Sequence, residues 1–331
     1  MVSIKDVAAL ANVSTATVSR ALSQPDKVSE DTRERVMQAV KQSGYRLNTA
    51  ARQFRKGRTE TVLALVPDIG NPFFTNIIQG IESAALEHGY RVVLGETRPE
   101  LSEPGSYAGY MQQRHADGAI LLGAEGAREF LKEAGDMPAV MACEQLTDAS
   151  FPTVRIDNEQ AALDATRLLI ELGHTQIAYI NGPPDNPVST DRLRGYRRAL
   201  GAAGIAMNED WISPGDFSPA SGYAAARQLM SGSQPPTAIF AISDPMAIGA
   251  MRAINELGLT IPGNVSLVGF DDIRFAEFTT PSLTTVHQPR ELIGQTAMHQ
   301  LAAQLAGDDV GGDTLLEHSL ITRESTARCE R

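Results

Sequence analysis

From about residue 60 to the end of the chain, short apolar runs alternate with amphipathic stretches. The runs TVLALV at 61–66 and VSLVGF at 265–270 are bounded by turn-forming residues, which is typical of buried strands. Helices are predicted between such runs, near 75–87, 159–172 and 190–203. After Pro152 the pattern restarts with a strand over TVRID. Strands that alternate with helices favour parallel βαβ units, so this region is predicted to form an α/β body of two Rossmann-like lobes.

Residues 1–45 have a different pattern, in which apolar positions recur at the spacing of a helix. A first helix is predicted to begin after Ser3, which forms an S-x-x-D capping box with Asp6. Its buried stripe is predicted to consist of Ile4, Val7, Leu10 and Ala11. The segment is therefore predicted to be an all-α head.

Turn-forming and capping residues divide the head into three helices. Asn12 tolerates the left-handed backbone that a tight corner requires, and Ser14 is a good N-cap for a second helix over 15–22. A third helix is predicted to begin after Ser29 and to end at Gly44. Three short helices with a tight corner form the helix-turn-helix geometry that places one helix in the major groove of DNA.

The outward face of the second helix carries short polar side chains and one long cation. These residues are Thr15, Thr17, Ser19 and Arg20. Short donors and acceptors approach base edges and phosphates closely, and Arg20 has the reach for a bidentate bond to guanine. The alternative is a three-helix interaction domain whose polar face is merely solvated.

The net charge of −11 is unevenly distributed along the chain. Residues 1–60 hold 11 Lys and Arg against 6 Asp and Glu, a balance of +5, whereas the remainder holds 18 against 34, a balance of −16. Phosphate binding needs local positive charge only, so an acidic body is compatible with a DNA-binding head.

A basic linker over 46–59 is predicted to be a hinge between head and body. Asn48 can cap a brief helix that runs through Phe54, with Arg52 among its cations. A helix of under two turns is marginal in water by itself.

Polar and aromatic side chains follow the predicted strands of both lobes. They are Asp68, Asn71, Phe73 and Phe74 in the first lobe, and Asn186, Arg192, Phe217, Ser243, Asp244 and Asp271 in the second. Ligands of open α/β sheets bind at the carboxyl ends of strands, and two facing lobes form a cleft for a small molecule. Hydrogen-bonding groups mixed with aromatic faces suit a flat ring or a sugar. Asp244 has the alternative interpretation of a helix N-cap, and Phe73 and Phe74 that of core residues.

Other functional classes lack their signatures in this chain. Cys143 and Cys329 are far apart and predicted to be reduced thiols, and the six histidines have no metal-ligand spacing. There is no GxGxxG after the first strand, P-loop, HExxH pair or nucleophile elbow, so no enzyme, metal or cofactor is predicted. No apolar run is long enough to span a membrane, and MVSIKDVAAL has no apolar signal region, which predicts a cytoplasmic protein.

Residues 4–36, with the core V-S-x-x-T-V-S-R, closely resemble the head of the lactose/galactose repressor family of bacterial transcription regulators. The resemblance continues through VPDIGNPFF, TVRIDN, RLRGY, ISDPMAIGA, VSLVGFDDI and LITRESTA, and so covers essentially the whole chain. It implies a periplasmic-binding-protein-like body and a repressor that binds a palindromic operator as a homodimer. A solute-binding protein without a DNA function is the remote alternative.

The resemblance also implies roles for individual residues of the head. Thr15 and Ala16 match the positions that choose the operator sequence, and Arg20 matches a further base contact. Family contacts to the DNA backbone or groove edge match Ser14, Thr17, Ser19, Lys27, Ser29 and Thr32.

In the hinge, the family pattern implies a helix that folds on DNA and wedges an apolar side chain into the minor groove. This chain departs from the pattern twice, with Leu47 where proline is common and Phe54 where leucine is usual. We expect Phe54 to be the wedge; the alternative is that it packs only against its dimer mate.

In the body, Arg192 and Asp271 match the family's most regular effector contacts. Asn186 and Val188 lie where members differ to suit their ligand, and Glu144 follows a strand end where effector contacts also occur. The wall positions match Phe73, Phe74 and Phe217. Runs such as PDKVS, GDF and PPTA are most similar to a nucleoside-responsive member, which implies a nucleoside effector. Ribose, another sugar or a purine are the alternatives.

The expected organisation is a head over 1–45, a hinge over 46–59 and a body over 60–331. Lobe 1 is expected to comprise about 60–158 and 287–312, and lobe 2 about 159–286 and 313–331.

Overall fold

A computed structural model describes residues 2–45, 58–97, 106–124, 137–146 and 151–330, together with Ala127, Arg128, Phe130 and Gly135. It divides into two compact units, Met1–Thr59 and Glu60–Arg331, and each is described by itself. Among the described residues, no helix has the length and apolar character needed to cross a membrane.

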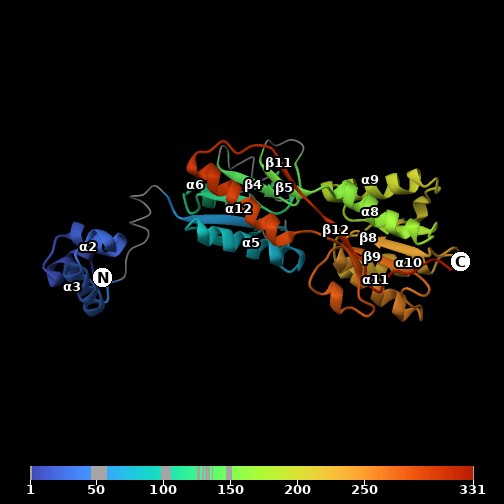
Figure 1. The fold of residues 1–331 in the computed structure, drawn as a ribbon, viewed down its shortest axis with the longest axis horizontal. Helices are drawn as coiled ribbons and strands as arrows, with labels where there is room; N and C mark the ends of the chain where they lie inside the picture. The colour runs from blue at the N-terminus through green and yellow to red at the C-terminus, as the bar shows by residue number, and fades with distance from the viewer. Residues whose placement is uncertain are drawn as a thin grey trace. The chain divides into compact units, whose positions relative to one another are not determined.

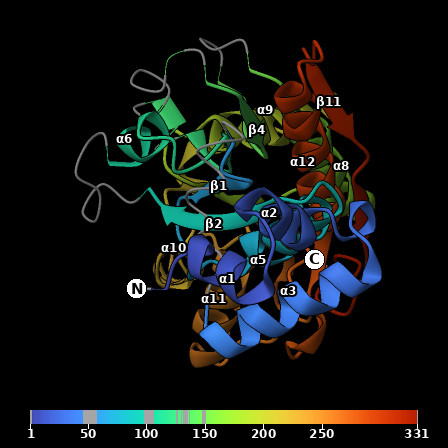
Figure 2. The same ribbon diagram turned by 90° about the vertical axis from the view of Figure 1, so that its left-hand side faces the viewer.

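The head is the predicted three-helix unit (Figure 2). Its elements are α1 (Ile4–Ala11), α2 (Thr15–Ser23), the 3-10 turn η1 (Pro25–Lys27) and α3 (Glu30–Ser43). The corner between α1 and α2 is left-handed at Asn12, with φ 52°, and the Ser14 hydroxyl accepts from the Thr17 N–H at 3.1 Å as the N-cap of α2. The capping box at Ser3 is also present, because its N–H donates to the Asp6 carboxylate at 2.8 Å.

One position of the predicted head core is wrong. Leu10 is 57% exposed, whereas Ala8 is buried beside Val7 and Ala11. The contacting face of α1 therefore consists of Ile4, Val7, Ala8 and Ala11, with Ala8 in place of Leu10. The core is completed by Val18, Ala21, Val36 and Ala39.

Lobe 1 of the body is a six-stranded parallel sheet in the order β11-β5-β4-β3-β1-β2. Its strands are β1 (Thr61–Val66), β2 (Arg91–Glu96), β3 (Gly118–Leu121), β4 (Ala139–Ala142), β5 (Thr153–Ile156) and β11 (Asp313–Leu316). Its helices are α5 (Phe73–Glu87), α6 (Ser106–Gln112) and α12 (Arg290–Ala306). Helices α5 and α12 lie side by side on one face of the sheet (Figure 1), and buried residues of α6 contribute to a separate core on the other.

Lobe 2 has a second six-stranded sheet in the order β12-β10-β9-β8-β6-β7, parallel except for β12. Its strands are β6 (Ile177–Ile180), β7 (Ile212–Ser213), β8 (Ala238–Ala241), β9 (Ser266–Asp271), β10 (Thr284–His287) and β12 (Ser319–Ile321). Its helices are α8 (Asn158–Glu171), α9 (Pro187–Ala202), α10 (Pro219–Met230) and α11 (Asp244–Glu256), with 3-10 turns η2 (Glu209–Trp211) and η3 (Ala276–Phe278). The pair α8 and α9 covers one face of the sheet and the pair α10 and α11 the other (Figure 1).

The chain crosses between the two sheets three times. The first crossing follows Ile156, the second follows His287 and the third follows Leu316. The third differs from the expected division at 312/313, because β11 pairs in parallel with β5 of lobe 1 before the chain returns to lobe 2 as β12. An edge strand of four residues can join either sheet, so its sequence does not reveal its lobe.

Two glycines let α5 and α12 pack with their backbones close together. A Cβ atom added at Gly80 would lie 2.1 Å from the Glu291 carbonyl oxygen, and one at Gly294 would lie 2.0 Å from the Ile77 carbonyl oxygen. Backbone atoms of a helix cannot move aside as a flexible side chain does. The seam between α5 and α12 therefore requires glycine at both positions.

Replacing Gly294 with alanine is expected to lower the free energy of unfolding by about 1–3 kcal/mol, since overpacking forces the two helices apart. Urea unfolding followed by circular dichroism measures this change. Gly201→Ala in α9 is the control, because a Cβ there meets nothing within 4 Å; alanine should be neutral or slightly stabilising at that helical position. Equal stability of Gly294→Ala and the natural chain would show that the seam tolerates a side chain.

Candidate effector cleft and nucleic-acid interface

Both lobes contribute the residues after their strands to one cleft. A small space, called the inner cavity, has a volume of about 60 Å³. Its lining consists of Asn71, Phe73, Phe74, Cys143, Glu144, Val188, Arg192, Phe217, Ser243, Asp271 and Gln288. Nine of these eleven residues were expected at an effector site, because parallel strands bring their carboxyl ends to one edge of each sheet.

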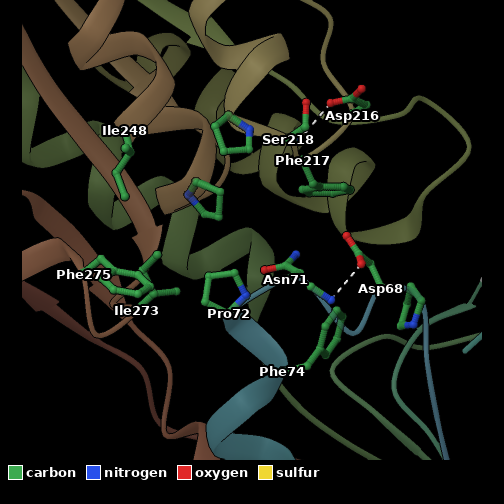
Figure 3. Close-up of a pocket in the computed structure, with 14 residues that line it drawn as sticks. Asp68, Asn71, Pro72, Phe74, Asp216, Phe217, Ser218, Ile248, Ile273 and Phe275 are labelled. Carbon is green, nitrogen blue, oxygen red and sulfur yellow. Dashed lines mark hydrogen bonds between the residues drawn. The ribbon is translucent and has the colours of Figure 1, made fainter. Parts of the chain in front are cut away.

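A wider space of about 660 Å³, called the vestibule, shares Asn71, Phe74 and Phe217 with the inner cavity (Figure 3). Its other lining residues are Pro67, Asp68, Gly70, Pro72, Asp216, Ser218, Pro219, Pro245, Ile248, Ile273 and Phe275. The volume falls in the range of small-molecule pockets. The inner cavity is thus the polar inner end of the cleft, and the vestibule is its larger mouth.

A buried ion pair lies at the inner end. Arg192 Nη1 is 3.7 Å from Asp271 Oδ1, and both side chains are about 5% exposed. The guanidinium also donates from Nε to Asn158 Oδ1 at 2.9 Å and from Nη1 to the Ile242 carbonyl at 2.6 Å. It stacks on the Phe270 ring, with Cζ 3.4 Å from the ring centroid. These contacts hold the arginine in one orientation.

Burial dominates the ionisation of the groups at this end. It raises the pKa of Asp271 to about 6, although Arg192, Arg290 and a hydrogen bond from Gln288 Nε2 at 2.8 Å favour the charged form. Burial also lowers the pKa of Arg192 and raises that of the free Cys143 thiol, which therefore stays protonated at neutral pH. The inner cavity thus presents the mutually compensated pair of Arg192 and Asp271 together with the Glu144 side chain.

The Ser243 hydroxyl is a polar group without a partner among the described residues. Its residue is 3% exposed, lines the inner cavity and is the N-cap of α11, but its Oγ makes no hydrogen bond. A buried hydroxyl left unsatisfied costs free energy that a bound polar ligand would recover. Ser243 therefore offers a hydrogen bond to whatever occupies the cavity.

Phe217 forms the wall between the two spaces and has an uncommon backbone conformation, with φ 65°. The neighbouring residues maintain it: the Ser218 N–H donates to Asp216 Oδ1 at 2.9 Å, and the Asp216 N–H donates to Ser221 Oγ at 3.2 Å. A strained backbone conformation persists only where the surrounding structure holds it in place, and such residues cluster at ligand-binding sites.

A hydrogen bond between Asn186 and Glu144 joins the two lobes across the cleft. Asn186 Nδ2 donates to Glu144 Oε1 at 3.1 Å, while Asn186 Oδ1 accepts from the Val188 and Ser189 N–H groups as the N-cap of α9. Glu144 also accepts from the Ala124 N–H at 2.7 Å. Asn186 itself lies outside the lining of both spaces.

Two further expected effector residues lie elsewhere than at the inner cavity. Asp68 lines only the vestibule. Asp244 is completely buried behind the cavity, where its carboxylate accepts from the Ile273 N–H at 2.8 Å and from Thr285 Oγ1 at 2.6 Å. The N-cap interpretation of Asp244 is wrong, because Ser243 occupies that position and Asp244 begins the helix.

Sequence reasoning missed Cys143 and Gln288, which both line the inner cavity. Cys143 directly follows β4, one residue before the predicted Glu144, and Gln288 directly follows β10. The strand-end rule could have found both had it been applied to the first residue after each of these strands.

On the head, a shallow depression lies over the outward face of α2. It is lined by Ile4, Thr15, Ala16, Ser19, Arg20, Ser23 and Gln24. Ser14, Lys27 and Ser29 are exposed, whereas Thr17 and Thr32 are half-buried and hydrogen-bonded to the hydroxyls of Ser14 and Ser29 respectively. The predicted hinge contacts Asn48, Arg52 and Phe54, and the departure at Leu47, lie outside the described residues.

A helix-turn-helix head and a two-lobed body with a ligand-sized cleft define the class of ligand-responsive DNA-binding regulators. Residues 3–48 match the family described as bacterial regulatory proteins, lacI family, and residues 166–326 match a periplasmic binding protein-like domain. The chain is 42% identical to the transcriptional repressor CytR of Escherichia coli (strain K12), over 98% of this chain and 96% of that one. It is 36% identical to the repressor PurR of Escherichia coli O1:K1 / APEC, over 99% and 97%.

Solved structures show the same relationship. The lac repressor dimer bound to operator and the anti-inducer ONPF matches with a TM-score of 0.88 at 29% identity, covering 98% of this chain and 99% of that one. The regulator CelR in complex with cellobiose matches with a TM-score of 0.76 at 37% identity, over 98% and 100%. The chain belongs to the LacI family: it is a transcriptional repressor with a DNA-binding head and an effector-binding body, and not an enzyme.

Proposed function

We propose that the chain binds a palindromic operator as a homodimer in the cytoplasm and that a nucleoside in the inter-lobe cleft controls this binding. The observation that carries the proposal is the inner cavity, where Arg192, Asp271 and the unpartnered Ser243 hydroxyl face aromatic walls. The sugar hydroxyls of a nucleoside bind at the polar end, and its base stacks against Phe74 and Phe217 toward the vestibule. Ribose, another sugar and a purine base are the competing ligands, and the cellobiose complex of a relative supports testing sugars.

The head, over about 1–45, supplies the operator contacts. Thr15 and Ala16 read bases at the start of α2, and Arg20 adds a further base contact from the same exposed face. The proposed backbone and groove-edge contacts are Ser14, Thr17, Ser19, Lys27, Ser29 and Thr32. In the hinge, over about 46–59, Asn48, Arg52 and Phe54 extend the contacts into the minor groove.

Selection of duplexes from a random pool, followed by fluorescence anisotropy at physiological salt, tests the proposal directly. We expect a palindromic site, bound about 10³-fold or more tightly than random duplex, and a dimer in sedimentation analysis. A screen of nucleosides, nucleobases, pentoses and cellobiose against this complex should identify a nucleoside as the ligand that changes operator affinity. The absence of any preferred palindrome would contradict the proposal for the head, and a response to a sugar alone would contradict it for the effector.

Arg20→Ala is expected to weaken binding to the selected operator by about 10- to 100-fold, since a base contact from arginine contributes about 1–3 kcal/mol. Lys41→Ala, on the exposed end of α3, removes the same charge outside the proposed contacts and serves as the control. Anisotropy titrations of both variants against operator and random duplex separate the two effects. Equal losses in the two variants would mean that Arg20 contributes charge and reads no base.

A further inference from the structure

The vestibule has an uneven distribution of charge. Asp68 and Asp216 are both exposed and lie on its rim beside Phe217, while Ile248, Ile273 and Phe275 form the apolar opposite side (Figure 3). Among the lining residues that the structure describes, no lysine or arginine is present. A ligand that enters therefore passes two carboxylates, and none of the described lining residues is positively charged.

Asp216 is held in place and ionised. Burial raises its pKa somewhat, but hydrogen bonds from Ser218 and Ser221 outweigh burial and leave the pKa below its ordinary value. Asp68 is fixed in a similar way, because its Oδ1 accepts from the Gly70 N–H at 2.8 Å. Both carboxylates are therefore permanent features of the rim, not side chains that swing away when an anion approaches.

Arg192, the one arginine among the described residues that line the inner cavity, is already engaged. Arg192 pairs with Asp271, donates to Asn158 and to the Ile242 carbonyl, and stacks on Phe270. Its charge is compensated before any ligand binds, so it can orient a hydroxyl but supplies little net attraction for an anion. Among the described residues that line the inner cavity, the buried polar side-chain atom without a partner is the neutral Ser243 hydroxyl, which points to a ligand with neutral hydrogen-bonding groups.

From this arrangement we infer that the effector site selects dephosphorylated ligands, nucleosides over nucleotides, and that Asp68 and Asp216 are the specificity-determining residues. In the proposed pose a 5′-phosphate lies with the sugar at the inner end. To reach it, the phosphate carries up to two negative charges past the rim carboxylates, whose field repels it, and no uncompensated cation among the described lining residues replaces its hydration. Discrimination by an unfavourable contact with the competitor is a general route to specificity. The inference rests on the proposed function, since it concerns the same cleft.

The test is calorimetric titration of the full-length chain with nucleosides and with their 5′-monophosphates, repeated with ribose and ribose 5-phosphate. At about 20 mM salt, whichever unphosphorylated ligand binds (nucleoside or ribose) should bind at least about tenfold more tightly than its phosphorylated counterpart. The difference should shrink at about 300 mM salt, because the rim carboxylates are exposed and salt screens them. In the double variant Asp68→Asn, Asp216→Asn the ratio of the two affinities should fall at least about fivefold.

Asparagine keeps the acceptor oxygens that the Gly70 and Ser218 N–H groups use, so the loops of this variant should stay folded, which thermal unfolding checks. The matched control is the double variant Asp308→Asn, Asp309→Asn, which also removes two charges. These residues lie just beyond the C-terminal end of α12, whereas the N-terminal end of α12 is the one near the crossing after His287. This helix spans roughly 25 Å, so the control should leave the ratio unchanged.

The outcomes separate the inference from the proposed function. Equal binding of a nucleoside and its monophosphate, or an affinity ratio that the Asp68 and Asp216 substitutions leave unchanged, overturns the inference while the nucleoside proposal stands. Selective binding of ribose over ribose 5-phosphate, with no binding of nucleosides, overturns the nucleoside proposal and supports the charge selectivity. Binding of neither pair overturns both.

Discussion

Replacing Arg192 with alanine is expected to abolish effector binding and to lower the free energy of unfolding by about 3–5 kcal/mol at pH 8. The guanidinium is the countercharge of the buried Asp271, and it joins α9 to α8 and β8 through Asn158 and the Ile242 carbonyl. Its removal leaves a buried carboxylate without its paired charge, although the hydrogen bond from Gln288 remains, and exposes the Phe270 ring to an empty space. The stability loss should be smaller at pH 5, where Asp271 can take up a proton instead of remaining charged.

Urea unfolding at the two pH values, together with calorimetric titration of the nucleoside, measures both effects. Arg194→Ala is the control on the same helix, because Arg194 is about half exposed and pairs with Glu159 and Asp191 at the surface. Such surface pairs contribute at most about 1 kcal/mol. Arg192→Lys keeps the charge but not the planar fork, so it should recover stability more than ligand binding. If Arg192→Ala bound the nucleoside normally, the cavity would not be the effector site.

Replacing Asp271 with asparagine is expected to change how stability depends on pH between about 4 and 7. The pKa of Asp271 is about 6 in the folded chain, against an ordinary value of 3.8, so the folded state binds this proton more tightly than the unfolded state. Its contribution to stability is therefore present below about pH 4 and is lost as the pH rises through about 6. The direction is opposite to that of a carboxylate such as Asp272, whose pKa hydrogen bonds from His287 and Arg323 lower despite its burial.

Relative to Asp271→Asn, the natural chain should lose on the order of 2–3 kcal/mol of unfolding free energy between pH 4 and pH 7. Asparagine retains the acceptor for Gln288, which limits the difference to the ionisation. The difference between the two chains across the pH series is the quantity to compare, because other groups titrate equally in both. A constant difference would show that Asp271 ionises normally and that the inner cavity is more hydrated than its burial indicates.

Local signals in the sequence predicted the head well. The corner at Asn12 and the cap at Ser14 depend on the properties of single residues and their nearest neighbours, so they appear in the sequence as they do in the structure. Leu10 failed because the spacing of apolar residues alone allowed it in the stripe, whereas the packing of three short helices selected Ala8.

The candidate site could be predicted because parallel strands bring their carboxyl ends to one edge of a sheet, even when the residues there are distant in the sequence. Arg192 and Asp271 are far apart in the chain, yet Asp271 ends β9 and Arg192 lies in α9, the helix after β6, so that Arg192 Nη1 is 3.7 Å from Asp271 Oδ1. Two features depend on tertiary contacts that no local pattern encodes: the burial of Asp244 against Thr285, and the bond from Asn186 to the opposite lobe. The assignment of β11 to lobe 1 also depends on a tertiary contact, because it follows from the pairing of β11 with β5.

The measurement that tests the central claim most directly is the nucleoside affinity of the dimer, determined with and without saturating operator. Two sites joined by one conformational equilibrium must affect each other by the same factor. Operator is expected to shift the nucleoside dissociation constant by at least about fivefold, and nucleoside to shift the operator dissociation constant by the same factor. An identical nucleoside affinity in the presence and absence of operator would contradict this coupling.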